Sequence, residues 1–570
     1  MAGYGFLFII GVPFTSMTQI LPFIMFGIGL DDAFILSGAY KRTDKTKDVV
    51  VRIEDTVEEV GISIFVTTVS SISAFSLGCI SSVPAVYWLC QYAIPTLFLD
   101  FFFQITFFIA LIVIDERRVI DKRRDCLVCM RADTSYNEID EEAEDSLGKY
   151  MLRFANFLMK TWVKALVIVV FLGFLGGMAY SASKLEQVFD FKDILPSGSY
   201  VAAYFSTQTD YTGGQFSIDP EIFFRGVDQS DEFTQNQMQE YVDELVNMKQ
   251  VTNQPVFFWL RDFKKFVASN GTDSIMFAEQ LDDFLANSTY SQLYKNDIVR
   301  TEDGSIITSR TQVFMDEVTL EVNNQIDALK DQRDVSASQP LNQNVKDWAF
   351  FTFQNLYYIW SLYEIAFYEL LLTTLFGITA VSIIGLLFIP HWSAILFVTP
   401  FITILYVDLL GFLQLAGVSI NAVSYIALVM SIGLLVDFLF HILLRYYESK
   451  ELSREEKVKD TLQTIGSSVL IGGISTFLGV IPLAFSTSDI FFTIFITFLG
   501  LVTIGITHGL IFIPVVLSIC GPNIVLDLSV KRKIEENHKA EDGDNNTGKN
   551  NEKDDNVNKS KERVTSDDNK

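Results

Sequence analysis

Nine long apolar stretches divide the chain, and each approaches the roughly 20 residues that a helix needs to cross the hydrocarbon core of a bilayer. They run over 19–38, 61–80, 86–114, 162–182, 366–389, 392–413, 420–444, 466–485 and 491–519. A shorter apolar run, GYGFLFIIGV, opens the sequence. The first span does not resemble a cleavable signal peptide, because no basic stretch precedes it. The pattern predicts a polytopic α-helical membrane protein, with about nine full spans and a partial one.

The largest polar segment, 184–365, alternates patterns typical of strands with patterns typical of amphipathic helices. EIFFRGV is strand-like, and a helical stretch, QNQMQEYVDELVNMKQV, follows it. FFWLRDFKKFV and SIMFAEQLDDFLANS have helical spacing, whereas DIVR and SIITSRTQVFM flank a turn at Asp303-Gly304 and predict a β-hairpin. A helix from Glu317 to about Arg333 completes a compact α+β domain, which we expect to contain a split βαβ unit.

These patterns predict six segments. They are 1–114 (a partial third span, then three full spans), 115–161 (a cytoplasmic linker), 162–183 (one span), 184–365 (the α+β domain), 366–520 (five spans) and 521–570 (a cytoplasmic tail). From about Lys531 the tail is rich in Asn, Asp, Glu and Lys and lacks aromatic residues, which predicts disorder.

Basic residues orient the spans. They cluster at Lys41–Arg52, Arg117–Lys164, Arg445–Lys459 and after Gly521, and alternation of nine spans brings all four clusters to one side. The positive-inside rule makes that side cytoplasmic, so 184–365 is predicted to be extracellular, most simply at the plasma membrane. Asn270 and Asn287 begin glycosylation acceptor triplets within this segment. A net charge of -26 and an acidic outer segment argue against nucleic acid as a partner.

The chain offers little for catalysis. None of its five cysteines lies in the outer segment, and Cys126-x-x-Cys129 has no partner pair or nearby histidine, so palmitoylation and inert thiols are equally good interpretations. Four histidines, no metal-ligand cluster, no nucleophile constellation and no phosphate-binding glycine loop predict a protein that is not an enzyme and has no metal or cofactor beyond a coupling ion.

The sequence contains an internal repeat. Gly27-x-x-x-Asp31 recurs as Gly433-x-x-x-Asp437 at an offset of 406. Further matches at an offset of 405 are Gly61-Ile62-Ser63 with Gly466-Ser467-Ser468, Val69-Ser70-Ser71 with Ile474-Ser475-Thr476, and Ser81-Ser82 with Ser486-Thr487. Two related halves of parallel topology are a transporter architecture. Because the second half has segments that the first lacks, we expect the chain to be a piece of a twelve-span protein that begins inside the third span.

Two adjacent acids, Asp31 and Asp32, interrupt the first full span. A carboxylate at mid-bilayer costs about 3 kcal/mol or more, and it persists where it is paired, protonated or on a polar path. Gly27 and Asp31 share one helix face, as do Gly433, Asp437 and His441, and glycine permits close helix approach. We therefore expect Asp31 and Asp437 to face each other, with His441 sharing or relaying a proton of Asp437.

Two interpretations of these acids stay open. Asp31, Asp32, Asp437 and His441 either bind a coupling ion, H⁺ or Na⁺, or form a buried hydrogen-bond network that locks the halves together. Other polar residues of the spans are weaker candidates for a functional site. We expect Asp100 to lack a repeat partner, Asp408 to be reached by water near the outer end of its span, Glu364 and Glu369 to mark the interface, and His508 to be structural.

Six motifs together resemble the Patched family, the eukaryotic branch of the resistance–nodulation–division (RND) transporters. They are GIGLDDAF, IDERRVIDKRRDC, FKDILPSGSY, SIGLLVDFLFHI, STFLGVIPLAFS and THGLIFIPVVLSICGP, and they run in order from Gly27 to Pro522. The resemblance is nearest to the Patched-related, or Patched-domain-containing, proteins. It implies that 1–114 is the later part of a sterol-sensing domain and that 184–365 is a porter-like extracellular domain.

The resemblance also implies a function. Members of the family move or bind sterols and other lipids, using a cation gradient through acids that match Asp31, Asp32 and Asp437. The leading hypothesis is a transporter of sterol or another membrane lipid coupled to H⁺ or Na⁺. The alternative is a sterol or lipid sensor or receptor on the same fold, which does not transport and binds an extracellular protein ligand.

Overall fold

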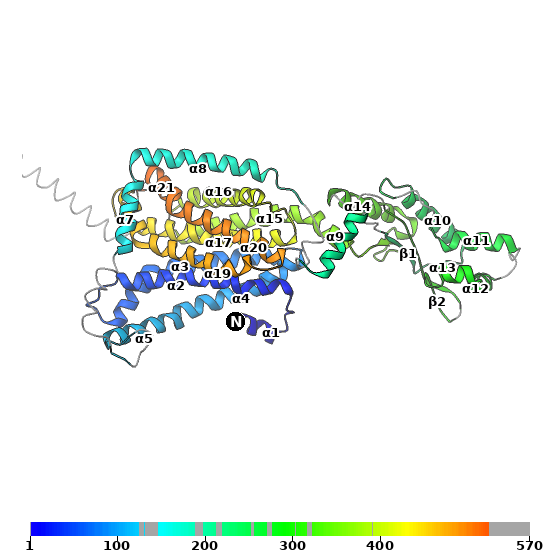
Figure 1. Ribbon diagram of the computed structural model, residues 1–570, viewed down its shortest axis with the longest axis horizontal. Coiled ribbons are helices and arrows are strands. Elements are labelled where there is room, and N and C mark those ends of the chain that lie inside the picture. Colours follow the sequence, from blue (N-terminus) through cyan, green and yellow to red (C-terminus); the bar gives the residue numbers. More distant parts are fainter. Residues whose placement is uncertain are drawn as a thin grey trace, which may run out of the picture.

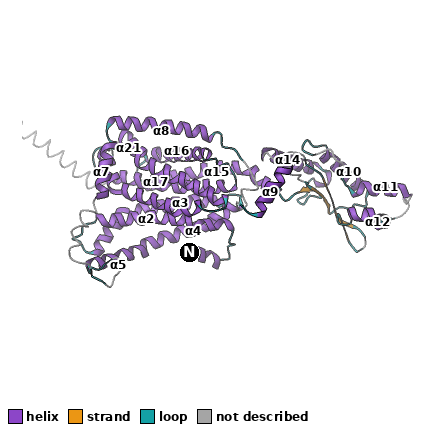
Figure 2. Ribbon diagram, viewed as in Figure 1, coloured by secondary structure: helices purple, strands orange, loops and turns teal. Residues whose placement is uncertain are grey.

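The computed structural model describes residues 2–124, 130–131, 146–187, 198–212, 219–251, 256–270, 276–302, 304–315, 322–389 and 391–523. It has two parts, a bundle of long helices and a smaller α+β domain that extends from one end of the bundle (Figure 1). Strands occur in the smaller part alone (Figure 2). Cys126, Cys129 and the tail from 524 lie outside the described residues.

Nine helical stretches of the described chain are long and apolar enough to span a membrane. They are Thr18–Arg42, Val49–Gly78, Pro84–Ile120, Thr161–Ala182, Tyr357–Phe388, Ala394–Leu415, Val423–Glu448, Arg454–Ala484 and Asp489–Cys520. Each overlaps one predicted span, so the prediction of a polytopic helical membrane protein is confirmed.

The helices of the first half are α1 (Ala2–Ile9), α2 (Leu21–Arg42), α3 (Val49–Gly78), α4 (Pro84–Phe103) and α5 (Ile109–Ile120). Those that follow are α7 (Ser146–Leu158), α8 (Thr161–Ala182), α15 (Tyr357–Phe388), α16 (Ala394–Leu415), α17 (Ala422–Glu448), α18 (Arg454–Thr461), α19 (Ser467–Ala484), α20 (Asp489–Thr507) and α21 (Ile513–Cys520). Single π-helical segments, Gln104–Phe108, Leu462–Gly466 and His508–Phe512, continue α4 into α5, α18 into α19 and α20 into α21.

Several helices extend beyond their apolar windows. α3 begins at Val49, because the Asp48 carboxylate accepts the Val50 amide hydrogen and caps the helix. Arg52 in its first turn is buried, pairs with Glu116 of α5 at 2.5 Å, and lies 4.2 Å from the centre of the Tyr40 ring of α2. The ends of α2, α3 and α5 are thereby held together.

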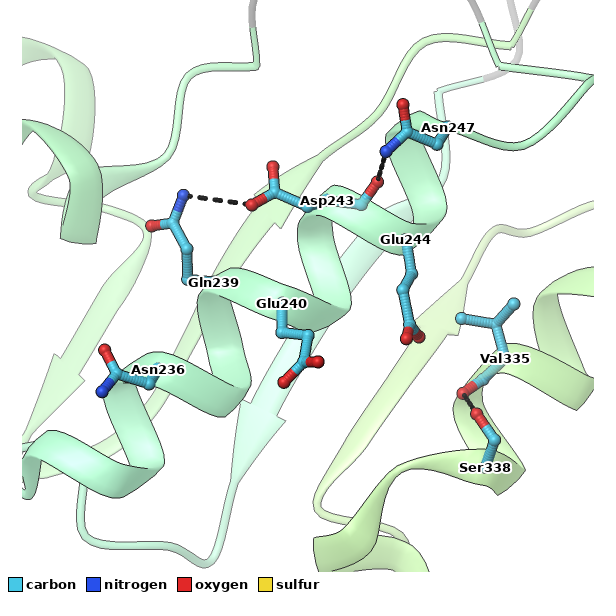
Figure 3. A pocket seen from close by; sticks show the side chains of 8 residues that line it. All are labelled: Asn236, Gln239, Glu240, Asp243, Glu244, Asn247, Val335 and Ser338. Carbon is cyan, nitrogen blue, oxygen red and sulfur yellow. Dashed lines mark hydrogen bonds between the residues drawn. The ribbon is translucent and has the colours of Figure 1, made fainter.

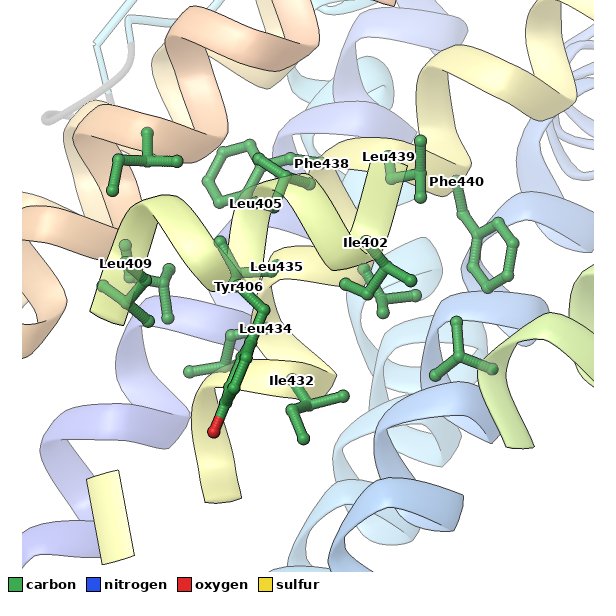
Figure 4. Packing of buried hydrophobic residues seen from close by; sticks show 14 of the residues in the cluster. Ile402, Leu405, Tyr406, Leu409, Ile432, Leu434, Leu435, Phe438, Leu439 and Phe440 are labelled. Carbon is green, nitrogen blue, oxygen red and sulfur yellow. The ribbon is translucent and has the colours of Figure 1, made fainter. Parts of the chain in front are cut away.

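The two halves of the bundle are interlocked. α2 packs against α19, and its repeat counterpart α17 packs against α3, so each half supplies a helix that is covered by the other. α17 is enclosed on nearly all sides, and Figure 4 shows Leu435, Phe438 and Leu439 of α17 beside Leu405 and Leu409 of α16. The apolar core of the bundle therefore runs through both halves as one cluster.

The basic segments gather at the end of the bundle that lies opposite the α+β domain (Figure 1). There α7 crosses the ends of the spans, and Lys164 of α8 pairs with Glu455 of α18 at 2.6 Å. Arg454 donates to the carbonyl of Ile519 at the end of α21. The described parts of three predicted basic clusters, Lys41–Arg52, Arg117–Lys164 and Arg445–Lys459, thus lie at one end of the bundle, and the side of the membrane that this end faces stays a prediction.

The α+β domain, called the outer domain from here on, is built on a four-stranded antiparallel sheet in the order β2-β3-β1-β4. The strands are β1 (Glu221–Arg225), β2 (Ile298–Arg300), β3 (Ile306–Gln312) and β4 (Phe350–Phe353). Phe223 of β1 aligns with Arg310 of β3 and with Phe351 of β4. Because β3 lies between β1 and β2, and β1 between β3 and β4, two split βαβ units interlock, and the predicted unit is confirmed.

Helices pack around this sheet. They are α10 (Glu232–Val246), α11 (Trp259–Asn270), α12 (Phe277–Ala286), α13 (Ser288–Tyr294) and α14 (Val322–Ser338). A further helix, α9 (Tyr200–Thr212), precedes β1 in the chain. An aromatic core formed by Phe224, Tyr241, Phe258, Trp259 and Phe284 lies between helices and sheet. α14 is described from Val322 and continues to Ser338, past the predicted end at Arg333.

Candidate functional site

The two adjacent acids of α2 are both buried, Asp31 at 8% and Asp32 at 7% exposure. Asp31 lies against α19, where Gly472 leaves the space that its carboxylate occupies: a Cβ on Gly472 would overlap Asp31 Oδ1. Asp32 interacts electrostatically with Asp31, Asp437 and Asp100. Together Asp31, Asp32, Asp437 and His441 form what we call the central site, between α2, α17, α3 and α19.

Asp437 lies where the repeat predicts, within electrostatic reach of Asp31. Its Oδ1 accepts a long hydrogen bond from Ser71 of α3 at 3.5 Å. The predicted proximity of Asp31 and Asp437 across the two halves is therefore present in the structure.

His441 is oriented differently from the prediction. Its Nδ1 is hydrogen-bonded to Ser63 Oγ of α3 at 2.8 Å, and its Nε2 lies 3.9 Å from Asp32 Oδ1. The acid that Nε2 approaches is thus Asp32 of the other half, and not Asp437 one turn earlier on its own helix. The i, i+4 spacing gave a common face, but the packing of α17 against α3 turns the ring toward Ser63 and α2.

The predicted packing glycines have matching roles in the two halves. Gly27 brings α2 close to α19, and its carbonyl accepts a hydrogen bond from Thr476 Oγ1 at 3.1 Å. The Gly433 carbonyl on α17 accepts from Ser71 Oγ of α3 at 3.3 Å. Ser71 and Thr476 were paired by the sequence repeat, so the same contact is made twice.

Asp100 lies next to the central site, although it was a weak candidate for a site residue in the sequence analysis. It lies on α4, where Gln104 Nε2 donates both to Asp100 Oδ2 at 3.0 Å and to the Gly29 carbonyl of α2 at 2.9 Å. Gly29 leaves room for it, because a Cβ there would lie 2.8 Å from Asp100 Oδ1. The signal in the sequence was Gln104, a polar residue four positions later on the same helix face.

Two expectations about span residues are wrong. Asp408 is not reached by water: it is 0% exposed, and its Oδ2 lies 2.9 Å from Nε2 of His508. Glu369 does more than mark the interface, because its carboxylate accepts hydrogen bonds from Ser81, Ser82 and Tyr425, and so ties the α3–α4 turn to α15 and α17. Glu364 does lie at the entry of α15, paired with Arg333 of the outer domain at 3.3 Å.

The two predicted glycan acceptors are exposed on the outer domain. Asn270 is the last residue of α11. Asn287 precedes α13 and caps it, since its Oδ1 accepts the Thr289 amide hydrogen at 3.0 Å. A glycan attaches through Nδ2, so the cap and a glycan use different atoms of the side chain.

An open groove crosses the outer domain between α10 and α14 (Figure 3). Glu240, Asp243 and Glu244 of α10 line one wall, and Val335 and Ser338 of α14 line the other. The groove is therefore acidic, in line with the charge of the whole chain.

The central site gathers three acids. Among the described residues, the interactions found for Asp31, Asp32 and Asp437 include no lysine or arginine. No group of three or more His, Cys, Asp or Glu side chains in the described ranges converges closely enough to hold a metal ion.

Comparisons with known proteins agree with the membrane architecture. Residues 1–132 match the family described as the sterol-sensing domain of SREBP cleavage-activation. The chain is 26% identical over 579 residues to NPC intracellular cholesterol transporter 1 homolog 1b of Drosophila melanogaster, which covers 88% of this chain and 46% of that protein. It is 24% identical over 558 residues to Patched-related protein 9 of Caenorhabditis elegans, which covers 96% of this chain and 63% of that protein.

The chain spans about half the length of the NPC relatives that it matches. In fold it is similar to the cryo-EM structure of the hedgehog release protein Disp from the water bear Hypsibius dujardini, with a TM-score of 0.60 and 15% identity over 91% of this chain and 66% of that one. The NPC relatives are named as cholesterol transporters and Disp as a release protein, and neither name is that of an enzyme. The chain is a multi-pass membrane protein that is similar to NPC and Patched-related proteins over most of its length and shares the fold of Disp.

Proposed function

We propose that the full-length protein carries sterol or another membrane lipid, and that proton binding at the central site drives this movement. The observation that carries the proposal is the gathering of three acids at that site. Asp31, Asp32 and Asp437 lie between the two repeated halves, and His441 lies beside Asp32.

Protons suit such a site because several neighbouring carboxylates cannot all remain ionised in a medium of low dielectric constant. Each proton that enters or leaves changes the repulsion between α2 and α17, which carry the acids. Since α2 is held by α19 and α17 by α3, a change at the centre is communicated to both halves. Na⁺ is the alternative coupling ion.

The lipid part of the proposal rests on the relatives. Two of them are named as NPC intracellular cholesterol transporters, and the family that matches 1–132 is named for sterol sensing. We accordingly propose that 1–114 is the later part of a sterol-sensing domain and that sterol is the first lipid to test.

We also propose a plasma-membrane protein with an extracellular α+β domain and a cytoplasmic C-terminus. The support is that the basic segments gather at the end of the bundle opposite that domain. A sterol or lipid sensor or receptor that does not transport, with an extracellular protein ligand, is the second candidate, and the sterol-sensing description favours it.

The test compares Asp32→Asn and Asp437→Asn with wild type in the full-length protein at matched surface expression. We expect sterol movement to fall at least about tenfold, the loss that follows from removing roughly 1.4 kcal/mol of coupling. Asp489→Asn, which removes an exposed acid at the start of α20, is the matched control and leaves movement unchanged.

Imposed gradients then identify the ion. Movement that follows a pH gradient in Na⁺-free buffer supports protons, and movement that follows Na⁺ at constant pH replaces them. Unchanged movement in both Asn variants would remove the central site from the mechanism, and sterol binding without any movement would favour the sensor.

A further inference from the structure

A second buried pair of ionisable groups lies outside the central site. Asp408 of α16 and His508, the first residue of the π segment His508–Phe512, are in contact at 2.9 Å between Oδ2 and Nε2. Their side chains are 0% and 2% exposed. Both carboxylate oxygens of Asp408 and Nε2 of His508 are buried, and none of the three has a hydrogen-bond partner in the structure.

The contacts of His508 determine which protons it carries. Its Nδ1 lies 2.9 Å from the Ile504 carbonyl, which only accepts hydrogen bonds, so Nδ1 carries a hydrogen. In a neutral imidazole Nε2 would then present a lone pair to Asp408. An ionised Asp408 facing that lone pair would be repulsive, so one further proton belongs between Nε2 and Oδ2.

Among the described residues, no lysine, arginine or further acid pairs with Asp408 or His508. Phe171 of α8 meets the imidazole edge-on at 4.9 Å between ring centres, with Phe174 and Phe512 close by. Lys164 of α8 pairs with Glu455, and Asp489 is exposed at the start of α20. On α17, Asp437 and His441 belong to the central site, Arg445 pairs with Asp460, and Glu448 is the last residue of the helix.

We propose that Asp408 and His508 form a second proton-binding site, separate from the central acids, which holds one proton between carboxylate and imidazole. With the proton bound, α16 is joined to the α20–α21 helix. When it leaves, an ionised carboxylate is left buried against a lone pair and a set of aromatic rings, and the contact between the two helices is weakened.

The pair is also next to the helix that carries Asp437. Phe438 of α17 occupies the space left by Gly505 and Gly509: a Cβ on Gly505 would lie 2.5 Å from its ring, and one on Gly509 would lie 3.4 Å from its carbonyl oxygen. Gly509 directly follows His508. If the imidazole moves, the adjacent backbone at Gly509 therefore pushes against the backbone of α17 at Phe438, one residue from Asp437.

The test reads the protons themselves and does not depend on transport. The full-length protein, labelled with ¹⁵N-histidine and reconstituted in lipid, is studied by solid-state NMR, with infrared spectroscopy of the protonated carboxyl group. His508→Gln assigns the resonance among the four histidines of the chain. We expect either a doubly protonated His508 or a protonated Asp408 at neutral pH.

Asp408→Asn removes the acid partner, and the imidazolium resonance or the carboxyl band should then disappear. Asp489→Asn, an exposed acid on the same helical unit, leaves both unchanged. If Asp408→Asn does not fold, the double variant Asp408→Asn with His508→Gln replaces both charges and tests the same band. A neutral His508 with a bare Nε2 beside an ionised Asp408, throughout the pH range in which the protein stays folded, overturns the proposal.

Discussion

Ser63 and His441 are hydrogen-bonded to each other at 2.8 Å between Oγ and Nδ1, although 378 positions separate them in the chain. The bond joins α3 of the first half to α17 of the second and fixes the ring so that Nε2 is directed toward Asp32. Ser63→Ala leaves a buried Nδ1 without a partner, which costs about 1–3 kcal/mol. We expect a lower thermal midpoint for the detergent-solubilised full-length protein.

Ser63→Thr is the matched variant, because it keeps the hydroxyl group. It should retain most of the stability that Ser63→Ala loses. Equal midpoints for Ser63→Ala and wild type would mean that His441 finds another partner at no cost.

The glycine contacts give a second prediction. A Cβ on Gly27 would lie 2.8 Å from Cγ2 of Thr476, so Gly27→Ala forces α2 away from α19 and strains the Thr476 hydrogen bond. We expect a loss of about 1–3 kcal/mol. Gly176→Ala on α8 is the control, since nothing lies within 4 Å of its added methyl group and alanine favours helix by up to about 1 kcal/mol. A Gly27→Ala protein as stable as Gly176→Ala would contradict the close packing of α2 on α19.

The outer domain should lose stability at high pH. Burial, and then a hydrogen bond of 2.5 Å to Asp262, raise the pKa of Tyr294. A raised pKa favours the protonated phenol in the folded state, so its contribution is complete below the ordinary tyrosine value of about 10 and is lost as the pH rises toward the folded value.

The midpoint of denaturant unfolding, followed by tyrosinate absorption, should therefore fall above about pH 10. Tyr294→Phe should make this decline shallower, whereas Tyr200→Phe, at an exposed tyrosine of α9, should leave it unchanged. An identical decline in all three proteins would show that Tyr294 ionises without cost.

Glycosylation tests the orientation of the domain. Thr289→Ala destroys the acceptor triplet at Asn287 and keeps the Asn287 cap of α13, and Asn287→Asp keeps an oxygen for the cap while removing the acceptor amide. Each of these variants of the full-length protein should lack one glycan and so have a smaller apparent mass on a gel. Asn270→Gln should lack the other glycan. Wild-type protein that does not shift on treatment with a glycosidase would argue against an extracellular domain carrying these glycans.

The span architecture could be predicted because membrane insertion depends on apolar length, which is local in the sequence. The repeat paired Gly27 with Gly433 and Ser71 with Thr476, and the structure shows these equivalent residues making equivalent contacts, Gly27 with Thr476 and Gly433 with Ser71. β4 was not predicted, because its residues FFTF are apolar and lead almost directly into α15. Nothing in the hydrophobic pattern therefore separates the strand from the span.

Side-chain partners were harder to predict. The position of a residue along a span indicates its depth in the membrane, but not which neighbouring helix its side chain contacts. Asp408 was therefore expected to be reached by water, although it lies against His508. His441 was assigned to Asp437 because the two share a helix face, whereas its contacts come from α3 and α2. Asp100 was given little weight because the repeat contains no matching acid.

The π segments Gln104–Phe108 and His508–Phe512 occur 404 positions apart, at matching places in the two halves. Each contains one residue more than the surrounding helical turns require. Because one inserted residue turns a helix by about 100°, the helical faces before and after each π segment are offset from each other. The side chains that precede Gln104 and His508 and those that follow them are therefore presented to different neighbours than an unbroken α-helix would give them.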